Sequence, residues 1–265
     1  MIITTASNDQ YAQHLGVMLT SLLENTKNIE LIKIFVIDGD ISTTNKTKLN
    51  NVVGRFTKEI TFLTPNNEIF SKLPMNSTID HITKETYFRV GLSKLLDKNI
   101  KKVLYLDCDL IVKEDISELW NTNIKKYVLA AVDESCLFYS HNKERLKKTL
   151  GLPKDSPYFN AGVMLLNIEK WRETKTSNRI VNYLQTHPKL KYMDQDALNA
   201  VLHKEWLPLD YKWNYTTYHW DALPLVQPAI IHFSGRYKPW NSTIRYKDEY
   251  FKYLKSSKWN ASEEL

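Results

Sequence analysis

Two aspartates one residue apart, Asp107 and Asp109, interrupt an apolar run between positions 103 and 112. Continuous apolar runs are typical of strands that are buried on both faces of a parallel sheet. Carboxylates at the end of such a strand would cost several kcal/mol without a compensating charge, so a cation is expected beside them. Ligands bind at the carboxyl ends of strands in open parallel sheets, and hard divalent cations prefer oxygen ligands. The pair therefore predicts a metal site that also holds the diphosphate of a sugar nucleotide.

The spacing alone does not decide between this site and other roles. Two aspartates separated by one residue occur at Asp38/Asp40, Asp107/Asp109 and Asp194/Asp196. Asp38 also follows a strand-like run, but Gly39 favours a tight turn before the next helix. Asp107 and Asp109, taken alone, are equally compatible with turn or helix-capping carboxylates.

Further polar groups occur at the ends of other apolar segments. The segment 157–163 contains Ala-Gly after Asn160, which predicts a strand that something approaches closely. His232 ends an apolar run and is followed by Gly235 and Lys238. These residues would supply a third metal ligand, a backbone amide for phosphate and a cation for phosphate. The alternative is a packed core histidine and a surface lysine.

The elements that must position these groups alternate between strands and helices. Strands are predicted near 1–5, 31–37, 60–63, 102–112, 128–132, 159–166 and 229–233. Helical periodicity occurs at 15–23, 87–96, 171–184 and 197–202. This alternation predicts an α/β fold with a mostly parallel sheet flanked by helices. We expect one domain over 1–240 and a short extension over 241–265.

Composition narrows the class of protein. The 265 residues are 43% hydrophobic and 25% charged, as in an ordinary globular protein. The net charge of +6 is spread along the chain and accompanies no nucleic-acid-binding motif, so nucleic acid is not an expected partner. No apolar stretch is long enough for a membrane span, and no signal peptide is predicted, which favours the cytoplasm. Cys108 and Cys136 cannot form a disulfide framework, and Cys108 is expected to be a small buried side chain.

Two aromatic regions have open interpretations. Basic and aromatic residues alternate over 236–259, which suits either contact with an anionic membrane surface or a helix whose aromatic side chains pack on the domain. The stretch 208–228 is rich in Tyr and Trp and suits either acceptor-sugar binding or plain packing.

Taken together, these motifs resemble glycosyltransferase family 8 from Thr5 to about Trp240. The resemblance is strongest to the bacterial lipopolysaccharide and lipooligosaccharide α-galactosyl- and glucosyltransferases, and glycogenin is a more distant member. It implies a GT-A fold with a Rossmann-like nucleotide half, a UDP-sugar donor, Mn²⁺ (or Mg²⁺) and retention at the anomeric carbon. The implied partners are a UDP-hexose and a saccharide, glycoprotein or glycolipid acceptor. The implied location is the bacterial cytoplasm, at the inner face of the membrane if the basic-aromatic extension contacts it.

The resemblance also implies a role for individual residues. Asp107, Asp109 and His232 correspond to metal ligands. Donor-binding positions correspond to Ala6, Asn8, Tyr11, Arg89, Cys108, Asn160, Ala161, Gly235 and Lys238, together with the two metal-binding aspartates. Asp194 and Gln195 correspond to the catalytic pair, and Tyr11 to the residue that stacks on uracil. Asn8 and Gln10 depart from the usual Asp and Asn, but an asparagine carbonyl still accepts from the uracil imide.

An amide at Gln195 disfavours a covalent intermediate of the kind formed on a carboxylate. We therefore expect front-face attack, in which the acceptor hydroxyl enters beside the leaving phosphate and gives it the proton. The alternatives are a catalytically degenerate sugar-nucleotide-binding protein on the same fold and a nucleotidyltransferase. The latter should carry a glycine-rich phosphate loop, and residues 1–12 contain no glycine. Galactose and glucose both remain open as the transferred sugar.

Overall fold

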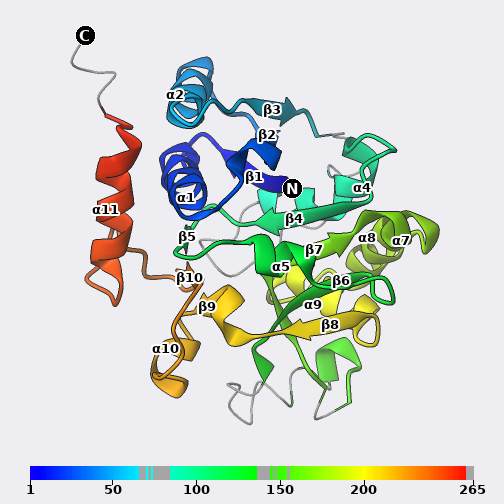
Figure 1. Cartoon of the computed structure of the whole chain (residues 1–265). Helices are drawn as coiled ribbons and strands as arrows, with labels where there is room; N and C mark the ends of the chain where they lie inside the picture. The colour runs from blue at the N-terminus through cyan, green and yellow to red at the C-terminus, as the bar shows by residue number, and fades with distance from the viewer. Residues whose placement is uncertain are drawn as a thin grey trace.

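A central sheet organises the molecule (Figure 1). The computed structural model describes residues 1–65, 70, 73, 84–135, 144, 146, 148–153 and 156–260. Seven strands form this sheet in the order β3 (Ile60–Leu63), β2 (Lys33–Gly39), β1 (Ile2–Asn8), β4 (Lys102–Leu106), β7 (Phe159–Asn167), β6 (Leu129–Asp133) and β8 (Trp206–Leu209). Cys136 and residues 261–265 lie outside the described part of the chain.

The sheet is mostly parallel, as the alternation of strands and helices predicts. β1 pairs in parallel with β2 and β4, β2 with β3, and β6 with β8. β7 is the exception, because it is antiparallel to both β4 and β6. The carboxyl end of β4 therefore meets the beginning of β7, and Leu106 lies opposite Val163.

The apolar run at 103–112 is divided between two sheets, which the sequence did not indicate. β4 ends at Leu106, and the run resumes as β5 (Leu110–Val112). β5 belongs to a second, three-stranded sheet with β10 (Ile230–His232) and β9 (Tyr215–Thr216). The turn that carries Asp107 and Asp109 thus joins the two sheets.

Both faces of the central sheet are covered, which explains the continuous apolar run in β4. Leu104 and Leu106 belong to the core beneath α1 (Ala12–Asn25) and α2 (Thr43–Gly54). Val103 and Tyr105 belong to the opposite core. That core is completed by α7 (Ile168–Glu173), α8 (Thr176–Thr186), α9 (Met193–Leu202), the 3₁₀ helix η2 (Lys84–Gly91) and α4 (Leu92–Leu95).

The remaining short elements lie in connections. They are the 3₁₀ helices η1 (Ile29–Leu31) and η4 (Tyr211–Asn214), and the helices α5 (Ser117–Asn121) and α10 (His219–Ala222). Within the described residues, every helix is too short or too polar to traverse a lipid bilayer.

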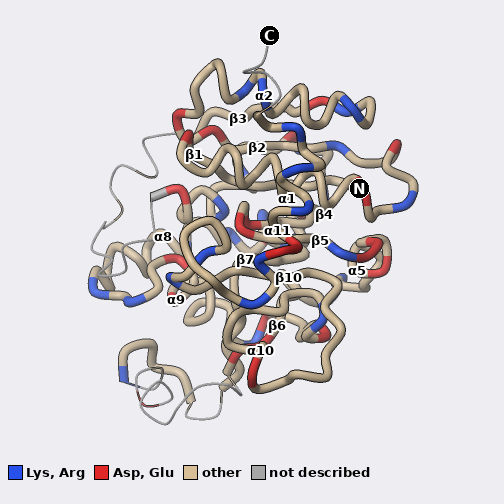
Figure 2. Tube along the Cα trace, turned by 90° about the vertical axis from the view of Figure 1, so that its left-hand side faces the viewer, with Lys and Arg blue, Asp and Glu red and all other residues tan. Residues whose placement is uncertain are grey.

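The basic-aromatic region packs on the domain through α11 (Lys247–Ser257), which lies beside α1 (Figure 1). Tyr250, Tyr253 and Trp259 are buried, and the Trp259 ring lies against Gly16 of α1. The helix carries charges of both signs, with Asp248 and Glu249 in its first turn and Lys255 in its last (Figure 2). The packing interpretation is thus confirmed, membrane contact gains no support, and the domain boundary after position 240 stays a prediction.

The aromatic stretch 208–228 is mainly structural. Its side chains with 7% exposure or less include Trp213, Asn214, Tyr215, Thr216, His219 and Trp220. Tyr218 differs, because it is half exposed and lines the cavity described below. Tyr218 is therefore the residue of this stretch that stays a candidate for binding an acceptor.

Candidate active site

A cavity of about 330 Å³ lies where β1 and β4 end and the second sheet begins. Every residue predicted to bind the donor, the metal or the transferred sugar lines this cavity, except Ala161. Ala161 is buried beneath it, where its backbone carbonyl accepts from Arg89 Nη1 at 2.6 Å. The fold thus brings segments that are far apart in the sequence to one place, although it does not by itself assign their roles.

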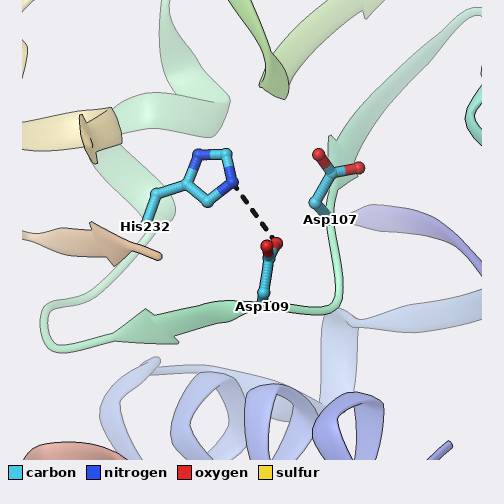
Figure 3. Close-up of side chains that lie close together, drawn as sticks. All are labelled: Asp107, Asp109 and His232. Carbon is cyan, nitrogen blue, oxygen red and sulfur yellow. Dashed lines mark ion pairs between the residues drawn. The ribbon is translucent and has the colours of Figure 1, made fainter. Parts of the chain in front are cut away.

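Asp107, Asp109 and His232 form one cluster (Figure 3). One ligand atom from each lies within 4.8 Å of the others. The antiparallel pairing of β5 with β10 places His232 opposite Leu110, and His232 Nε2 lies 3.3 Å from Asp109 Oδ1. Two carboxylates and an imidazole suit Mn²⁺, since carboxylates bind hard cations and imidazole favours transition metals.

The second nitrogen of His232 is fixed by a buried amide. His232 Nδ1 donates to Asn214 Oδ1 at 2.8 Å, and Asn214 is fully buried. A hydrogen bond of this kind sets the tautomer and leaves Nε2 as the nitrogen that could bind a metal. The donor set and its orientation therefore fit a divalent cation.

Gly162 shows what approaches β7 closely. A Cβ at this position would lie 2.3 Å from His232 Cε1 and 2.9 Å from Asp107 Oδ2. Asp107 N donates to the Gly162 carbonyl at 2.8 Å, which holds this strand against the acidic turn. The predicted close approach at Ala-Gly is confirmed, and the approaching groups are His232 and Asp107.

Two cations neutralise the acids. Lys238 Nζ lies 2.6 Å from Asp109 Oδ2, and Lys238 is only 3% exposed. Arg89 Nη2 lies 3.0 Å from Asp107 Oδ1, and Arg89 Nε lies 3.1 Å from Asp194 Oδ2. Burial alone would raise the pKa of Asp109, but Lys238 and His232 hold that pKa well below its usual range. The acids are therefore ion-paired, as the buried strand end requires.

Asp194 and Gln195 lie in the first turn of α9, and different contacts hold their two side chains. Gln195 Oε1 accepts from Ala161 N–H at 3.0 Å, and its Nε2 donates to Tyr158 Oη at 3.3 Å. Asp194 is 3% exposed, and burial raises the pKa of its carboxyl to about 6 despite the Arg89 charge. Arg89 Nε donates its hydrogen bond to the Thr86 carbonyl at 3.0 Å, so its contact with Asp194 Oδ2 is an ion pair.

At the other end of the cavity, Asn8 is already hydrogen-bonded within the protein. Asn8 Oδ1 accepts from Tyr11 N–H at 3.1 Å, and Asn8 Nδ2 donates to Glu85 Oε2 at 3.4 Å. Glu85 is 8% exposed and lines the cavity. A carboxylate therefore stands beside the position where the family usually carries Asp. Cys108 behaves as expected: its Sγ donates to the Ala6 carbonyl, and burial raises the pKa of its thiol to about 12.

Asp38 and Asp196, from the other two aspartate pairs, have structural roles. Asp38 Oδ1 accepts from Ile41 N–H at 2.8 Å, which confirms the predicted turn before α2. Asp196 Oδ1 accepts from Tyr158 Oη at 2.7 Å, and its Oδ2 accepts from Tyr192 N–H at 3.0 Å. Neither Asp38 nor Asp196 lines the cavity.

Several cavity residues were missed by the sequence analysis. They are Ser7, Glu85, Thr86, Tyr105, Glu134, Tyr192, Ser234 and Arg236. The sequence could have indicated Glu134. Asp133 and Glu134 follow the apolar run 128–132, just as Asp107 and Asp109 follow an apolar run. Glu85 had no such signal, because its burial depends on packing against Gly39.

Solved structures with the same architecture include the galactosyltransferase LgtC in complex with donor and acceptor sugar analogues. Its TM-score is 0.85 at 28% identity, and the match covers 97% of this chain and 96% of that one. The mixed sheet, the acidic turn at its carboxyl edge and this likeness define a glycosyltransferase of the GT-A fold.

Sequence comparisons specify the family. Residues 2–244 match the family described as Glycosyl transferase family 8. General stress protein A of Bacillus subtilis (strain 168) is 37% identical over 280 residues, which cover 98% of this chain and 95% of that protein. The lipopolysaccharide 1,2-glucosyltransferase of Escherichia coli (strain K12) is 27% identical over 264 residues, which cover 94% and 76%. The chain belongs to glycosyl transferase family 8.

Proposed function

We propose that this glycosyltransferase moves a hexose, galactose or glucose, from its UDP derivative to a saccharide acceptor with retention at the anomeric carbon. Asp107, Asp109 and His232 would hold Mn²⁺, with Mg²⁺ as the alternative. The observation that carries the proposal is the meeting of these three ligands with Lys238 and Arg89 in one cavity. Such a site suits a diphosphate that is bound through both a metal and cations.

The diphosphate end depends on the second sheet and the segment after it. A bound divalent cation supplies positive charge that offsets the charge developing on the leaving UDP. Lys238 is already held in the cavity by Asp109 and by the Phe233 carbonyl, so it is oriented before any ligand arrives. Gly235 lines the same wall, and its missing side chain leaves the backbone amide open to a phosphate.

The uracil end would be formed by Tyr11 and by the pair of Asn8 and Glu85. Tyr11 presents a ring for stacking, which suits a planar base. Asn8 Nδ2 and the Glu85 carboxylate lie side by side and offer one donor and one acceptor. Uracil carries a complementary carbonyl and imide N–H next to each other, so Glu85 can replace the carboxylate that is absent at position 8.

The reaction centre favours front-face attack. Asp194 is ion-paired with Arg89 and buried, while the Gln195 carbonyl is engaged by Ala161 N–H. Both groups are thereby held as polar contacts to the sugar rather than as free nucleophiles. The acceptor hydroxyl would form the new bond to the anomeric carbon on the side of the departing phosphate. The anomeric carbon–oxygen bond to UDP breaks, and the departing phosphate oxygen takes the hydroxyl proton.

The relatives support a hexose donor and a saccharide acceptor. The LgtC structure holds donor and acceptor sugar analogues, and the Escherichia coli relative is named a glucosyltransferase. We infer that the acceptor of this chain is a glycan, free or attached to a lipid or protein. We also infer that the enzyme acts in the cytoplasm, where UDP-sugars are the available donors.

The test is a donor screen with purified protein. UDP-glucose, UDP-galactose and UDP-N-acetylhexosamines are incubated with and without Mn²⁺, and released UDP is measured. We expect Mn²⁺-dependent release from one hexose donor and its loss in Asp109→Asn, with no loss in the control Asp221→Asn, an exposed residue of α10. A donor that turns over equally without divalent cation, or in Asp109→Asn, would refute the metal assignment.

The Bacillus subtilis relative is named a stress protein rather than a transferase. A second function on the same fold is therefore a protein that binds sugar nucleotides without transferring the sugar. Calorimetry with UDP separates the two readings. Tight Mn²⁺-dependent UDP binding without turnover, across all donors and a panel of simple glycosides, would favour the binder.

A further inference from the structure

Tyr158 is a fully buried tyrosine whose hydroxyl lies behind the proposed reaction centre. It directly precedes β7 and does not line the cavity. Its Oη donates to Asp196 Oδ1 at 2.7 Å and accepts from Gln195 Nε2 at 3.3 Å. A carboxylate accepts hydrogen bonds, so the hydroxyl gives its proton to Asp196 and meets Gln195 as an acceptor. Tyr158 therefore connects a buried acid to a residue of the cavity.

The Gln195 amide is held in one orientation by this hydroxyl and by the backbone of β7. Gln195 Oε1 accepts from Ala161 N–H at 3.0 Å, and a backbone N–H can only donate. Turning the amide over would place its NH₂ group against that N–H and its oxygen against the Tyr158 hydroxyl, whose proton is given to Asp196. The oxygen of Gln195 is therefore fixed on the side of β7, and its NH₂ group on the side of Tyr158.

Asp196 is held in turn by the backbone at the start of α9. Its carboxylate is fully buried, and Oδ2 accepts from Tyr192 N–H at 3.0 Å. Met193, the first residue of α9, has a φ of 44°, which residues other than glycine adopt rarely. Strained backbone of this kind persists only where the surrounding contacts impose it, and it gathers at active sites. The acid thus stabilises the strained turn and also orients the hydroxyl behind Gln195.

Asn199, one turn further along α9, joins the same helix to the same strand. Asn199 Oδ1 accepts from Phe159 N–H at 2.8 Å, and its Nδ2 donates to the Phe159 carbonyl and to the Gln195 carbonyl, both at 2.9 Å. The backbone of Gln195 is therefore connected to the residue that follows Tyr158. Because of this connection, the hydroxyl and the amide keep a fixed separation.

We propose that Tyr158, oriented by Asp196, is a positioning residue that holds the Gln195 amide in the orientation required for sugar transfer. The inference rests on the proposed function, in which Gln195 contacts the transferred sugar. Neither Tyr158 nor Asp196 lines the cavity, so their effect on the reaction passes through Gln195. A reacting group misplaced by about 1 Å can lower the rate about 100-fold, so such support affects kcat more than it affects UDP binding.

Tyr158→Phe removes the hydroxyl and keeps the ring. The matched control is Tyr253→Phe, because Tyr253 is also buried and its hydroxyl accepts from Asn25 Nδ2 at 2.7 Å on α11. Circular dichroism and Tm establish that both variants are folded. We expect Tyr158→Phe to keep UDP affinity within about twofold and to lower kcat for UDP release from the hexose donor by roughly 10- to 100-fold. The control should keep both quantities within about twofold of wild type.

A double-mutant cycle with Gln195→Ala separates positioning from general damage. Residues that act through one contact give non-additive effects, whereas independent losses add. Once the Gln195 side chain is absent, Tyr158→Phe should lower kcat by no more than about a further twofold.

Asp196→Asn is a second variant that keeps the shape of the side chain. Its oxygen must face Tyr192 N–H, which turns its NH₂ group toward the Tyr158 hydroxyl. The hydroxyl then meets an NH₂ group on both sides, and its proton competes with Gln195 Nε2. We expect a loss in kcat of roughly 10- to 100-fold, and no more than about a further twofold when Tyr158→Phe is already present.

A measurement without turnover keeps the test independent of the transferase proposal. In protein labelled with ¹⁵N-glutamine, the side-chain NH₂ signal of Gln195 is assigned by its absence in Gln195→Ala. We expect Tyr158→Phe to shift this signal and to speed the exchange of its hydrogens with water, and Tyr253→Phe to leave it unchanged. If the wild-type protein releases UDP from no donor, the transferase proposal fails, while this signal still reports on the contact.

Several outcomes overturn the proposal. An unchanged Gln195 signal in Tyr158→Phe would show that the hydroxyl does not hold the amide. Losses in kcat that multiply with those of Gln195→Ala would give Tyr158 a general structural role, as would an equal loss in Tyr253→Phe. Wild-type kcat in Asp196→Asn would remove the carboxylate from the chain of contacts.

Discussion

Replacing Gly162 by alanine adds one methyl group at the most crowded point beside Asp107 and His232, two of the proposed metal ligands. The new Cβ would lie 2.3 Å from His232 Cε1, where ordinary contact begins at 3.4 Å. The strand cannot easily retreat, because the Gly162 carbonyl accepts from Asp107 N–H and β7 pairs with strands on both sides. The imidazole must therefore give way by about 1 Å.

A shift of that size exceeds what a metal site tolerates. Ligand distances in a working site lie within about 0.2 Å of their normal values. Perturbing the groups that orient metal ligands typically costs 10- to 100-fold in affinity, or about 1.4 to 2.7 kcal/mol. We expect Gly162→Ala to lose Mn²⁺ affinity in this range and to raise the Mn²⁺ concentration needed for half-maximal UDP release by the same factor.

Calorimetric titration with Mn²⁺, in the presence of saturating UDP, measures the loss directly. Gly54→Ala is the control, because nothing lies within 4 Å of a Cβ at Gly54. Circular dichroism establishes that both variants are folded. A folded Gly162→Ala protein that binds Mn²⁺ within twofold of wild type would refute the argument that this glycine makes room for His232.

Three further predictions follow from the same contacts. Asn214→Ala removes the acceptor that fixes His232 Nδ1, so Mn²⁺ affinity should fall 10- to 100-fold in the same titration while the protein stays folded; unchanged affinity would contradict the orienting role. Asp194 has a pKa raised from 3.8 to about 6 by burial, so its charge destabilises the folded state increasingly as pH rises through that interval. Denaturant unfolding measures the free energy of unfolding of both proteins. Between pH 4 and pH 7, that of Asp194→Asn should rise relative to wild type by up to about 3 kcal/mol. A difference between the two proteins that does not vary with pH would contradict this prediction. Trp259→Ala removes a buried ring that packs against α1, so it should lower the free energy of unfolding by about 3–5 kcal/mol. A loss below about 1 kcal/mol would place this residue outside the core.

Much of the fold could be predicted because its signals are local. The continuous apolar run before Asp107 indicated a strand covered on both faces, and Leu104 and Tyr105 indeed point into different cores. Ala-Gly after Asn160 indicated a close approach, which Gly162 makes to His232. Periodicity, strand ends and small residues can be recognised from neighbours in the sequence.

What could not be predicted depends on contacts between distant segments. The separation of β4 from β5 into two sheets follows from pairing with β10, which no local pattern reveals. Asn214 lies in an aromatic stretch that suggested sugar binding, yet it is buried as the partner of His232. Glu85 supplies a carboxylate next to Asn8 only because a 3₁₀ helix brings it against Gly39.

The packing of α11 on α1 has a consequence for how the protein is made. Asn25 Nδ2 donates to Tyr253 Oη at 2.7 Å, a contact between residues 228 positions apart. During synthesis, α1 and the first strands leave the ribosome long before the helix that covers them. Contacts of such long range slow folding, and apolar surface that waits for its cover invites aggregation. The half that holds Tyr11 therefore completes its core only after Trp259 has been translated.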